Sequence, residues 1–215
     1  MRLVLLGPPG AGKGTQAKCL EKKFGIPHVS TGEILRQAIS SGSHLGEEAA
    51  RYMNGGSLVP NPLILDIVRE RQARADCASG YVLDGFPRTI DQVRQLDHLL
   101  DGTGTPLHAV FSLEVRLEMF LKRLSARRVC SNCGVIYNLL TTAPLREGVC
   151  DACGAPLTQR PDDVEDTIRK RFQIYQRQTS DIKEFYLSKG LLREINGEGT
   201  VEEVHRLVVE SLKTR

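Results

Sequence analysis

The feature that most constrains this chain is a glycine-rich loop near its start. The sequence GPPGAGKGT, residues 7–15, follows the short apolar run RLVLL and precedes a helix-compatible run, GTQAKCLEKKF. Gly7, Gly12 and Lys13 match the spacing of a phosphate-binding loop, in which backbone N–H groups and the positive end of a helix surround phosphate oxygens. A strand, such a loop and a helix predict an α/β fold that binds a phosphorylated ligand.

The loop departs from the usual pattern at one position. The residue after the lysine is normally Ser or Thr, whose hydroxyl reaches Mg²⁺, but here it is Gly14, and Thr15 follows one place later. A glycine-rich turn without chemical function is the alternative interpretation, and the position between a strand and a helix argues against it. We therefore expect phosphate binding without direct coordination of Mg²⁺ by the loop.

Composition limits the class of protein. A chain of 215 residues with 40% hydrophobic content can bury one main core and is too short for two large domains. The 29 basic and 26 acidic residues nearly balance, which argues against nucleic-acid binding by charge alone. The sequence has neither an uncharged apolar stretch of about 18 residues nor a signal-peptide core, so we expect a cytoplasmic protein without membrane contact.

Apolar runs alternate with helix-length segments along the chain. The strands expected from this pattern are residues 2–6, 81–84, 107–113 and 190–195. Helix starts are marked by Ser30 with Glu33 and by Thr200 with Glu203, and an apolar stripe over 164–190 predicts a long helix. This rhythm predicts a parallel sheet covered by helices on both faces, interrupted by a helical segment near 30–60 and by a cysteine-rich segment.

The cysteine-rich segment has the spacing of a metal site. Two C-x2-C pairs are separated by sixteen residues and comprise Cys130, Cys133, Cys150 and Cys153. Four thiolates complete a tetrahedral coordination sphere, so the metal would be structural, and it would replace the core that this segment is too polar to form. Disulfides are disfavoured in a reducing compartment, whereas iron would fit the same donors as zinc. The remaining Cys19 and Cys77 are expected to be inert.

Further motifs agree with one enzyme family. The sequences GKGTQ, STGEILR (30–36), GSLVP (56–60), LDGFPRT (83–89), RLSARR (123–128) and QRPDD (159–163) occur in the order and spacing of bacterial adenylate kinases with a long, zinc-bearing lid. The chain resembles this branch of the nucleoside monophosphate kinases over essentially its whole length. The resemblance implies a P-loop NTPase-type parallel β-sheet flanked by helices, with a helical NMP-binding insertion and a zinc-ribbon-like lid.

The resemblance also implies an activity and a division of the chain. The reaction would be the reversible, Mg²⁺-dependent conversion of ATP and AMP to two molecules of ADP, which maintains adenine nucleotide balance. The substrates would be ATP, AMP and ADP, and the protein would be a monomer. The implied core comprises 1–29, 60–126 and 164–215, the AMP-binding segment 30–59, and the lid 127–163.

The resemblance implies particular roles for individual residues. Those for ATP binding are Gly10, Ala11, Gly12, Lys13, Gly14, Thr15, Arg123, Arg127, Ile136, Tyr137 and Gly199. Those for AMP binding are Thr31, Arg36, Ser57, Leu58, Val59, Gly85, Phe86, Pro87, Arg88, Gln92, Arg160 and Arg171. Those for catalysis are Lys13, Asp84, Arg88, Arg123, Arg127, Arg160 and Arg171.

The cations suit the reaction because four phosphates must be held together. Arginine can contact phosphate oxygens through two parallel N–H groups, and it would stabilise the charge that spreads over the transferred group. Neighbouring basic residues leave Arg128 as an alternative to Arg127. For Ile136 and Tyr137, a hydrophobic contact within the lid is an equally good interpretation.

The attacking phosphate oxygen is already ionised, so no general base is needed. The five histidines, at 28, 44, 98, 108 and 205, are therefore expected to have packing or surface roles. Asp84 ends a predicted strand and would order the waters around Mg²⁺, with a helix cap or ion pair as the alternative. Asp162 and Asp163 are interpreted as structural, either as ion-pair partners of the lid or as caps of the following helix.

Base selection would depend on smaller features. Thr31 and Gln92 favour AMP over a pyrimidine acceptor, and Gln92 offers a paired amide contact to an adenine edge. The donor contacts near Gly199 are looser, so ATP is expected and some use of GTP stays open. The alternative from another class is a zinc-ribbon nucleic-acid-binding protein with a regulatory NTPase loop, against which stand 5% aromatic content and no tryptophan.

Overall fold

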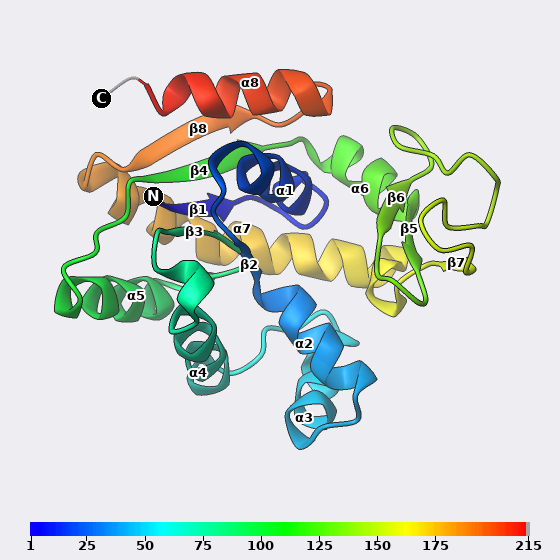
Figure 1. Cartoon of the computed structure of the whole chain (residues 1–215), viewed down its shortest axis with the longest axis horizontal. Coiled ribbons are helices and arrows are strands. Elements are labelled where there is room, and N and C mark those ends of the chain that lie inside the picture. The colour runs from blue at the N-terminus through cyan, green and yellow to red at the C-terminus, as the bar shows by residue number, and fades with distance from the viewer. Residues whose placement is uncertain (214–215) are drawn as a thin grey trace.

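The central element of the fold is a parallel β-sheet with helices on both faces (Figure 1). The structure is a computed structural model that describes residues 1–213. The strand order is β2-β3-β1-β4-β8, and all neighbours are parallel. The strands are β1 (Arg2–Leu6), β2 (His28–Ser30), β3 (Tyr81–Asp84), β4 (Ala109–Glu114) and β8 (Leu192–Asn196). The predicted fold class is confirmed.

Two hydrophobic layers hold helices against the sheet. The covering helices are α1 (Lys13–Phe24), α4 (Asn61–Gln72), α5 (Ile90–Gly102), α7 (Glu165–Ser188) and α8 (Val201–Ser211). Because strand side chains alternate, Leu3 and Leu5 of β1 pack with α1 and α8, whereas Val4 and Leu6 face the layer that contains α4, α5 and α7. These layers fix the edge of the sheet at which the strands end.

The carboxyl ends of the parallel strands determine where a ligand can bind. In the register of β1 and β3, Leu5 lies opposite Asp84, so the loop after β1 and the loop after β3 emerge side by side. In open α/β sheets, ligands bind beyond these carboxyl ends. The glycine-rich loop and Asp84 are therefore placed together by the sheet itself.

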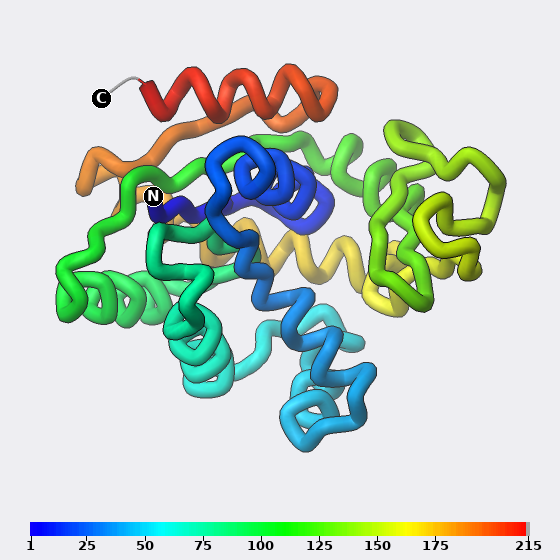
Figure 2. Tube along the Cα trace, viewed as in Figure 1, coloured from blue at the N-terminus to red at the C-terminus, as the bar shows by residue number. Residues whose placement is uncertain are grey.

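A pair of short helices projects from the body below the sheet (Figures 1 and 2). It consists of α2 (Thr31–Ser40) and α3 (His44–Met53), which Ser30 and Ser43 cap by accepting hydrogen bonds from backbone N–H groups. The helices are closely packed, because a Cβ atom at Gly46 would lie 2.1 Å from the carbonyl oxygen of Ala38. This pair occupies most of the predicted segment 30–59.

The cysteine-rich segment forms a second, smaller sheet set apart from the body (Figure 2). Its antiparallel strands are β5 (Arg127–Cys130), β6 (Ile136–Asn138) and β7 (Leu157–Thr158), in the order β6-β5-β7. The helix α6 (Leu117–Ser125) leads into it, and the turn η2 (Pro161–Asp163) leads out into α7. A further turn, η1 (Ala75–Cys77), precedes β3.

Several predicted boundaries differ from the structure. The last strand begins at Leu192, not at residue 190, because Gly190 turns with φ 68° and the Leu191 N–H still bonds the carbonyl of Tyr186. The strand predicted at 107–113 spans Ala109–Glu114, and β2 was not predicted. Thr200 and Glu203 form a complete capping box. No helix within residues 1–213 has the length and apolar character needed to cross a membrane.

Candidate active site and metal centre

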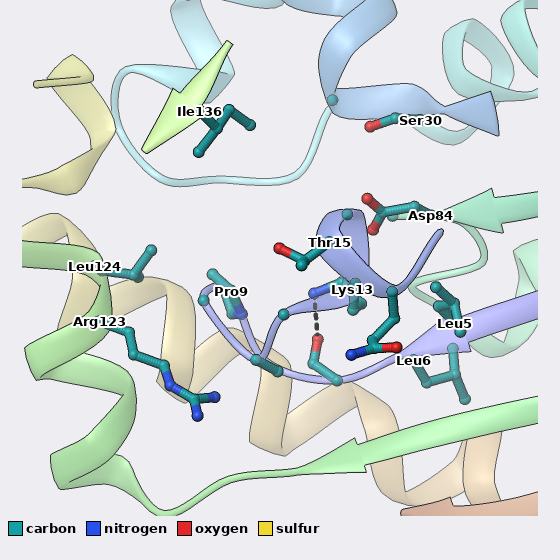
Figure 3. A pocket seen from close by; sticks show the side chains of 18 of the residues that line it. Leu5, Leu6, Pro9, Lys13, Thr15, Ser30, Asp84, Arg123, Leu124 and Ile136 are labelled. Carbon is teal, nitrogen blue, oxygen red and sulfur yellow. Dashed lines mark hydrogen bonds between the residues drawn. The ribbon is translucent and has the colours of Figure 1, made fainter. Parts of the chain in front are cut away.

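A cavity of about 980 Å³ lies at the carboxyl edge of the sheet, between the glycine-rich loop, the α2–α3 pair and the lid strands (Figure 3). Its lining includes every residue predicted to bind nucleotide or to act in catalysis except Phe86. Phe86 is only 1% exposed and packs in the core beneath the cavity. Its neighbours Gly85 and Pro87 do line the cavity.

The glycine-rich loop is held closed by its own lysine. Gly12 has φ 95° and ends the loop, and α1 begins at Lys13 without a side-chain cap, which leaves its first N–H groups available to an anion. The Lys13 ammonium donates to the carbonyls of Gly7 at 2.8 Å and Pro8 at 2.9 Å, and Figure 3 shows one hydrogen bond from Lys13 to the loop. An ammonium has three donors, so the third is free for a phosphate oxygen.

The charge of Lys13 is sensitive to its surroundings. Burial lowers the pKa of Lys13 to about 8, and Asp84 opposes this effect, while Arg88, Arg171 and Arg127 add to it. A neighbouring anion would raise the pKa of Lys13 again and stabilise its ammonium form. The electrostatics around Lys13 thus favour the binding of an anion.

Six arginines converge on the same cavity from different parts of the chain. They are Arg36, Arg88, Arg123, Arg127, Arg160 and Arg171. Burial lowers the pKa of Arg36, Arg88, Arg160 and Arg171, and the positive charges of other arginines lower each of them further. The Nε atom of Arg160 is buried and has no hydrogen-bond partner among the described residues. Such a cluster is suited to bind several phosphate groups.

Two of these arginines are paired at the base of the lid. Arg127 donates to Asp163 through Nε at 2.6 Å and also through Nη2, and the Asp163 side chain is 0% exposed. Arg171 donates to Asp162 at 2.7 Å. Val164, not an aspartate, caps α7, so of the two predicted roles for Asp162 and Asp163 the structure has the ion pairs. Arg128 does not line the cavity and bonds nearby backbone carbonyls.

Asp84 lies beneath the glycine-rich loop with a partner that the sequence did not indicate. His28 Nε2 is 3.3 Å from Asp84 Oδ2, and the histidine side chain is buried. Burial alone would raise the pKa of Asp84, but the hydrogen bond from His28 and the charges of Lys13 and Arg88 outweigh it and lower the pKa. The carboxylate is therefore ionised at neutral pH.

Asp84 also lies next to the position at which the loop departs from the usual pattern. A Cβ atom at Gly14 would lie 3.4 Å from Asp84 Oδ2 and 4.0 Å from the His28 ring. Both are ordinary van der Waals distances, so a side chain at this position would lie directly against the carboxylate. The space used for a metal-binding hydroxyl in other phosphate-binding loops is here next to a carboxylate, whose oxygens are ligands or water acceptors suited to Mg²⁺.

The four lid cysteines form a cluster that fits a metal ion. Their sulfur atoms all lie within 4.8 Å of one another, with Cys130 and Cys153 at 3.4 Å and Cys133 and Cys150 at 3.6 Å. A tetrahedral site with Zn–S bonds of about 2.3 Å requires sulfur separations of about 3.8 Å. All four cysteines are free, so the disulfide alternative is not what the structure contains.

Comparison with known proteins identifies the family that has this combination of sites. The sequence profile of the family described as adenylate kinase matches residues 5–191. The chain belongs to the adenylate kinase family. The adenylate kinases of Thermodesulfovibrio yellowstonii and Trichlorobacter lovleyi are 45% and 48% identical to it over 215 and 212 residues, covering 100% and 99% of each chain. The adenylate kinase of Archaeoglobus fulgidus is 42% identical over 217 residues, with full coverage of both chains.

Membership of the adenylate kinase family makes the chain a phosphotransferase that interconverts ATP plus AMP and two ADP. The matched range 5–191 includes all four cysteines, so the cluster lies within the part of the chain that matches the kinase family. The family prediction made from the motifs is confirmed.

Gln92, which was predicted to contact the AMP base, has a fixed orientation in the cavity of this adenylate kinase family member. Its Oε1 accepts from the Arg88 N–H at 2.7 Å, its Nε2 donates to Asn61 at 2.8 Å, and the residue is 2% exposed. Each amide atom keeps one unused hydrogen-bonding position. The paired contact to a base predicted for Gln92 is therefore compatible with these bonds.

Arg123, which was predicted to bind ATP, connects α6 to the loop before α8. Its Nη1 donates to the carbonyl of Gly197 at 2.7 Å, and its Nη2 lies 3.5 Å from the carbonyl of Gly199. Arg123 and Gly199, which are 76 residues apart in sequence, thus meet as predicted for one binding site. Asn138 bonds the carbonyl of Arg123 at 2.8 Å and joins the lid to the same place.

Proposed function

We propose that the chain catalyses reversible phosphoryl transfer from Mg·ATP to AMP within the 980 Å³ cavity. The observation that carries this proposal is the convergence of Lys13, Asp84 and the arginines on one cavity from separate segments of the chain. The reaction brings several phosphate groups together, and only a concentrated set of cations can offset their repulsion.

The donor nucleotide is proposed to bind along the glycine-rich loop. Its phosphates would accept hydrogen bonds from the backbone of residues 10–15 and from the free donor of Lys13. The base would lie between Arg123 and the backbone near Gly199, and β6 would add the contacts of Ile136 and Tyr137. Backbone contacts discriminate weakly between bases, so ATP is the proposed donor and limited use of GTP is compatible with the site.

The acceptor nucleotide is proposed to bind against the α2–α3 pair. Arg36 and Arg88 would hold the AMP phosphate, with Arg160 and Arg171 between the two phosphate groups. Thr31, the backbone of residues 57–59, Gly85 and Gln92 would surround the base. The unused positions on the Gln92 amide support an adenine acceptor, because adenine presents one donor and one acceptor on a single edge.

Catalysis is proposed to depend on positioning and electrostatic stabilisation. The attacking oxygen of AMP is ionised, so Lys13 and the arginines need only align it with the γ-phosphate and stabilise the charge of the transition state. When bound with ATP, Mg²⁺ neutralises charge on the β- and γ-phosphates. Asp84, ionised and oriented by His28, is the residue that would order the waters of that ion.

We propose zinc as the resident metal of the cysteine cluster. Four thiolates at near-tetrahedral separations suit Zn²⁺, although iron has the same preference. With all four positions occupied by protein, the ion would stabilise the lid without touching substrate. Residues 127–163 would close over ATP as the lid, residues 30–59 over AMP, and residues 1–29, 60–126 and 164–215 would stay as the core. The proposed setting is a cytoplasmic monomer without a nucleic-acid partner.

The test is an acceptor panel. Purified protein is incubated with Mg·ATP and, separately, AMP, UMP, CMP and GMP, and diphosphates are separated by chromatography. ADP from AMP, with traces at most from the others, is expected. A pyrimidine preference would overturn the roles of Thr31 and Gln92, and a folded, metal-loaded sample that transfers nothing would overturn the proposal.

Single-residue variants and a control test whether the activity depends on residues of the cavity. Lys13→Ala and Arg88→Ala are each expected to lose most of the turnover with an unchanged circular dichroism spectrum. Arg94→Ala, which removes an exposed arginine of α5, is the control and is expected to retain it. Near-normal kinetics in Lys13→Ala or Arg88→Ala would contradict the proposed roles.

A further inference from the structure

Tyr137 lies between the metal centre and the nucleotide cavity. It is the middle residue of β6, and its neighbours Ile136 and Asn138 both line the cavity. The tyrosine itself is 8% exposed and packs in the small core of the lid with Cys130 and Cys150. Tyr137 also lines the cavity, so the residue lies against both the core of the lid and the nucleotide cavity.

The hydroxyl group of Tyr137 has two partners, and both belong to the metal-binding knuckle. The backbone N–H of Asp151 donates to it at 2.8 Å, and Cys150 Sγ lies 3.5 Å away. The first bond uses the oxygen as an acceptor, so the hydroxyl proton is left for the sulfur. A metal-bound thiolate has no proton and can only accept, which permits one direction for this bond.

We propose that the Tyr137 hydroxyl donates a hydrogen bond to the metal-bound Cys150 thiolate and so positions the metal centre on β6, rather than binding nucleotide. Any contact of Tyr137 with ATP is then made by its main chain. The inference rests on the proposal that the four cysteines hold zinc.

The inferred bond joins the metal to the cavity in three short steps. Cys150 is bonded to the hydroxyl, the tyrosine is part of β6, and the next residue, Asn138, bonds the carbonyl of Arg123 at 2.8 Å. Outer hydrogen bonds to metal ligands commonly contribute about 10- to 100-fold to metal affinity. Zinc thereby sets the position of a strand that lines the donor site, although the ion is remote from the reacting phosphates.

The test compares Tyr137→Phe with wild type and with Tyr81→Phe, which removes a buried hydroxyl from β3 in the core. Zinc affinity is measured by competition with a chromophoric chelator, and ATP kinetics are measured at saturating zinc. Tyr137→Phe is expected to bind zinc about 10-fold more weakly, with kcat and the KM for ATP within about twofold of wild type. Tyr81→Phe is expected to match wild type in both measurements.

A spectroscopic measurement separates the hydrogen bond from a general loosening of the lid. In cobalt-substituted protein, the thiolate-to-metal charge-transfer band is expected to move to lower energy in Tyr137→Phe, because a thiolate without its hydrogen bond gives up electron density more readily. An unmoved band together with unchanged zinc affinity would overturn the inference. An increased KM for ATP with unchanged zinc affinity would overturn it and assign the hydroxyl to nucleotide binding.

The outcomes also distinguish this inference from the proposed zinc site. Wild-type protein that binds no zinc would overturn both. Wild-type protein with one tightly bound zinc, and a Tyr137→Phe variant that equals it in affinity and cobalt spectrum, would overturn only the role of Tyr137.

Discussion

Lys13 closes the glycine-rich loop, and its ammonium group has a lowered pKa. Its ammonium bonds two loop carbonyls, and burial lowers the pKa of Lys13 to about 8. Phosphate favours the charged form, so ATP binding raises this pKa. We predict that ATP binding at pH 8 takes up about half a proton, and that ATP affinity falls as the pH rises above 8 because the free enzyme must then be protonated first.

Proton uptake is measured by titration calorimetry at pH 8 in two buffers with different ionisation enthalpies. Lys13→Ala is the control. Because it lacks the ammonium group, it is expected to take up no proton at this position when ATP binds at pH 8. Equal uptake by the variant and wild type would assign the proton to another group.

For individual residues, the sequence predicted the members of short motifs better than it predicted which residues contact each other in space. Lys13, Asp84 and Arg88 could be located because each stands in a short pattern with a chemical meaning. His28 could not, because its partner Asp84 is 56 positions away and only the pairing of β2 with β3 brings them together. The role expected for His28, packing or a surface position, omitted its hydrogen bond to the carboxylate.

The α2–α3 pair depends on the absence of one side chain. A Cβ atom at Gly46 would meet the carbonyl oxygen of Ala38 at 2.1 Å, and this contact involves backbone that cannot move aside. We predict that Gly46→Ala separates the two helices and lowers the free energy of unfolding by about 1–3 kcal/mol, the usual cost of overpacking. The KM for AMP should rise several-fold and the KM for ATP should change little.

The control for this variant is Gly102→Ala. Gly102 ends α5, and a Cβ atom there would meet nothing within 4 Å. Thermal unfolding and steady-state kinetics on both variants separate a steric effect from that of an added methyl group. If Gly46→Ala matched Gly102→Ala in both measurements, the close packing of α2 on α3 would not determine AMP binding.

The lid sheet depends on the metal more than on its core. Few buried apolar residues accompany Cys130, Tyr137 and Cys150. We predict that Cys130→Ser lowers the zinc content and the melting temperature while some activity remains at low temperature, because the ion stabilises the lid without contacting substrate. Metal analysis and melting curves test this, with Cys19→Ser as the control that should retain zinc. Unchanged zinc content and melting in Cys130→Ser would exclude a structural metal.

Strands could be predicted where an apolar run was long enough to be recognised in the sequence. The apolar runs at residues 2–6 and 81–84 gave strands with those bounds. The strand β2 was missed because it has only three residues, His28–Ser30, of which one is apolar, so no alternation is visible in sequence. Its position is set by pairing with β3, which is a tertiary effect.

In the whole molecule, α7 connects the two segments proposed to move. Lys170 donates to the carbonyl of Gly55 at 2.7 Å, next to the α2–α3 pair. The next residue of this helix, Arg171, donates a hydrogen bond to Asp162 at the base of the lid. The sequence left open whether Asp162 pairs or caps a helix, because both roles suit an aspartate before a helix, and only the spatial position of Arg171 decides between them.

Arg171 is proposed to lie where the two nucleotide sites meet. A Cβ atom at Gly56 would lie 3.1 Å from Arg171 Cγ and 2.9 Å from Thr167 Cγ2. Gly56 also has φ 69°, which costs an L-residue about 1–2 kcal/mol. We predict that Gly56→Ala displaces Arg171 and weakens binding of both ATP and AMP several-fold, because this arginine is proposed to bridge both sets of phosphates.

The matched control is Gly104→Ala. Gly104 has φ 62° and open space around its Cβ position, so the substitution introduces the same backbone strain without a contact. Both variants should lose similar stability in denaturant unfolding, but only Gly56→Ala should weaken nucleotide binding by calorimetry. If Gly56→Ala weakened AMP binding alone, as expected for Gly46→Ala, then Arg171 would serve one site, and α7 would not couple the α2–α3 pair to the lid.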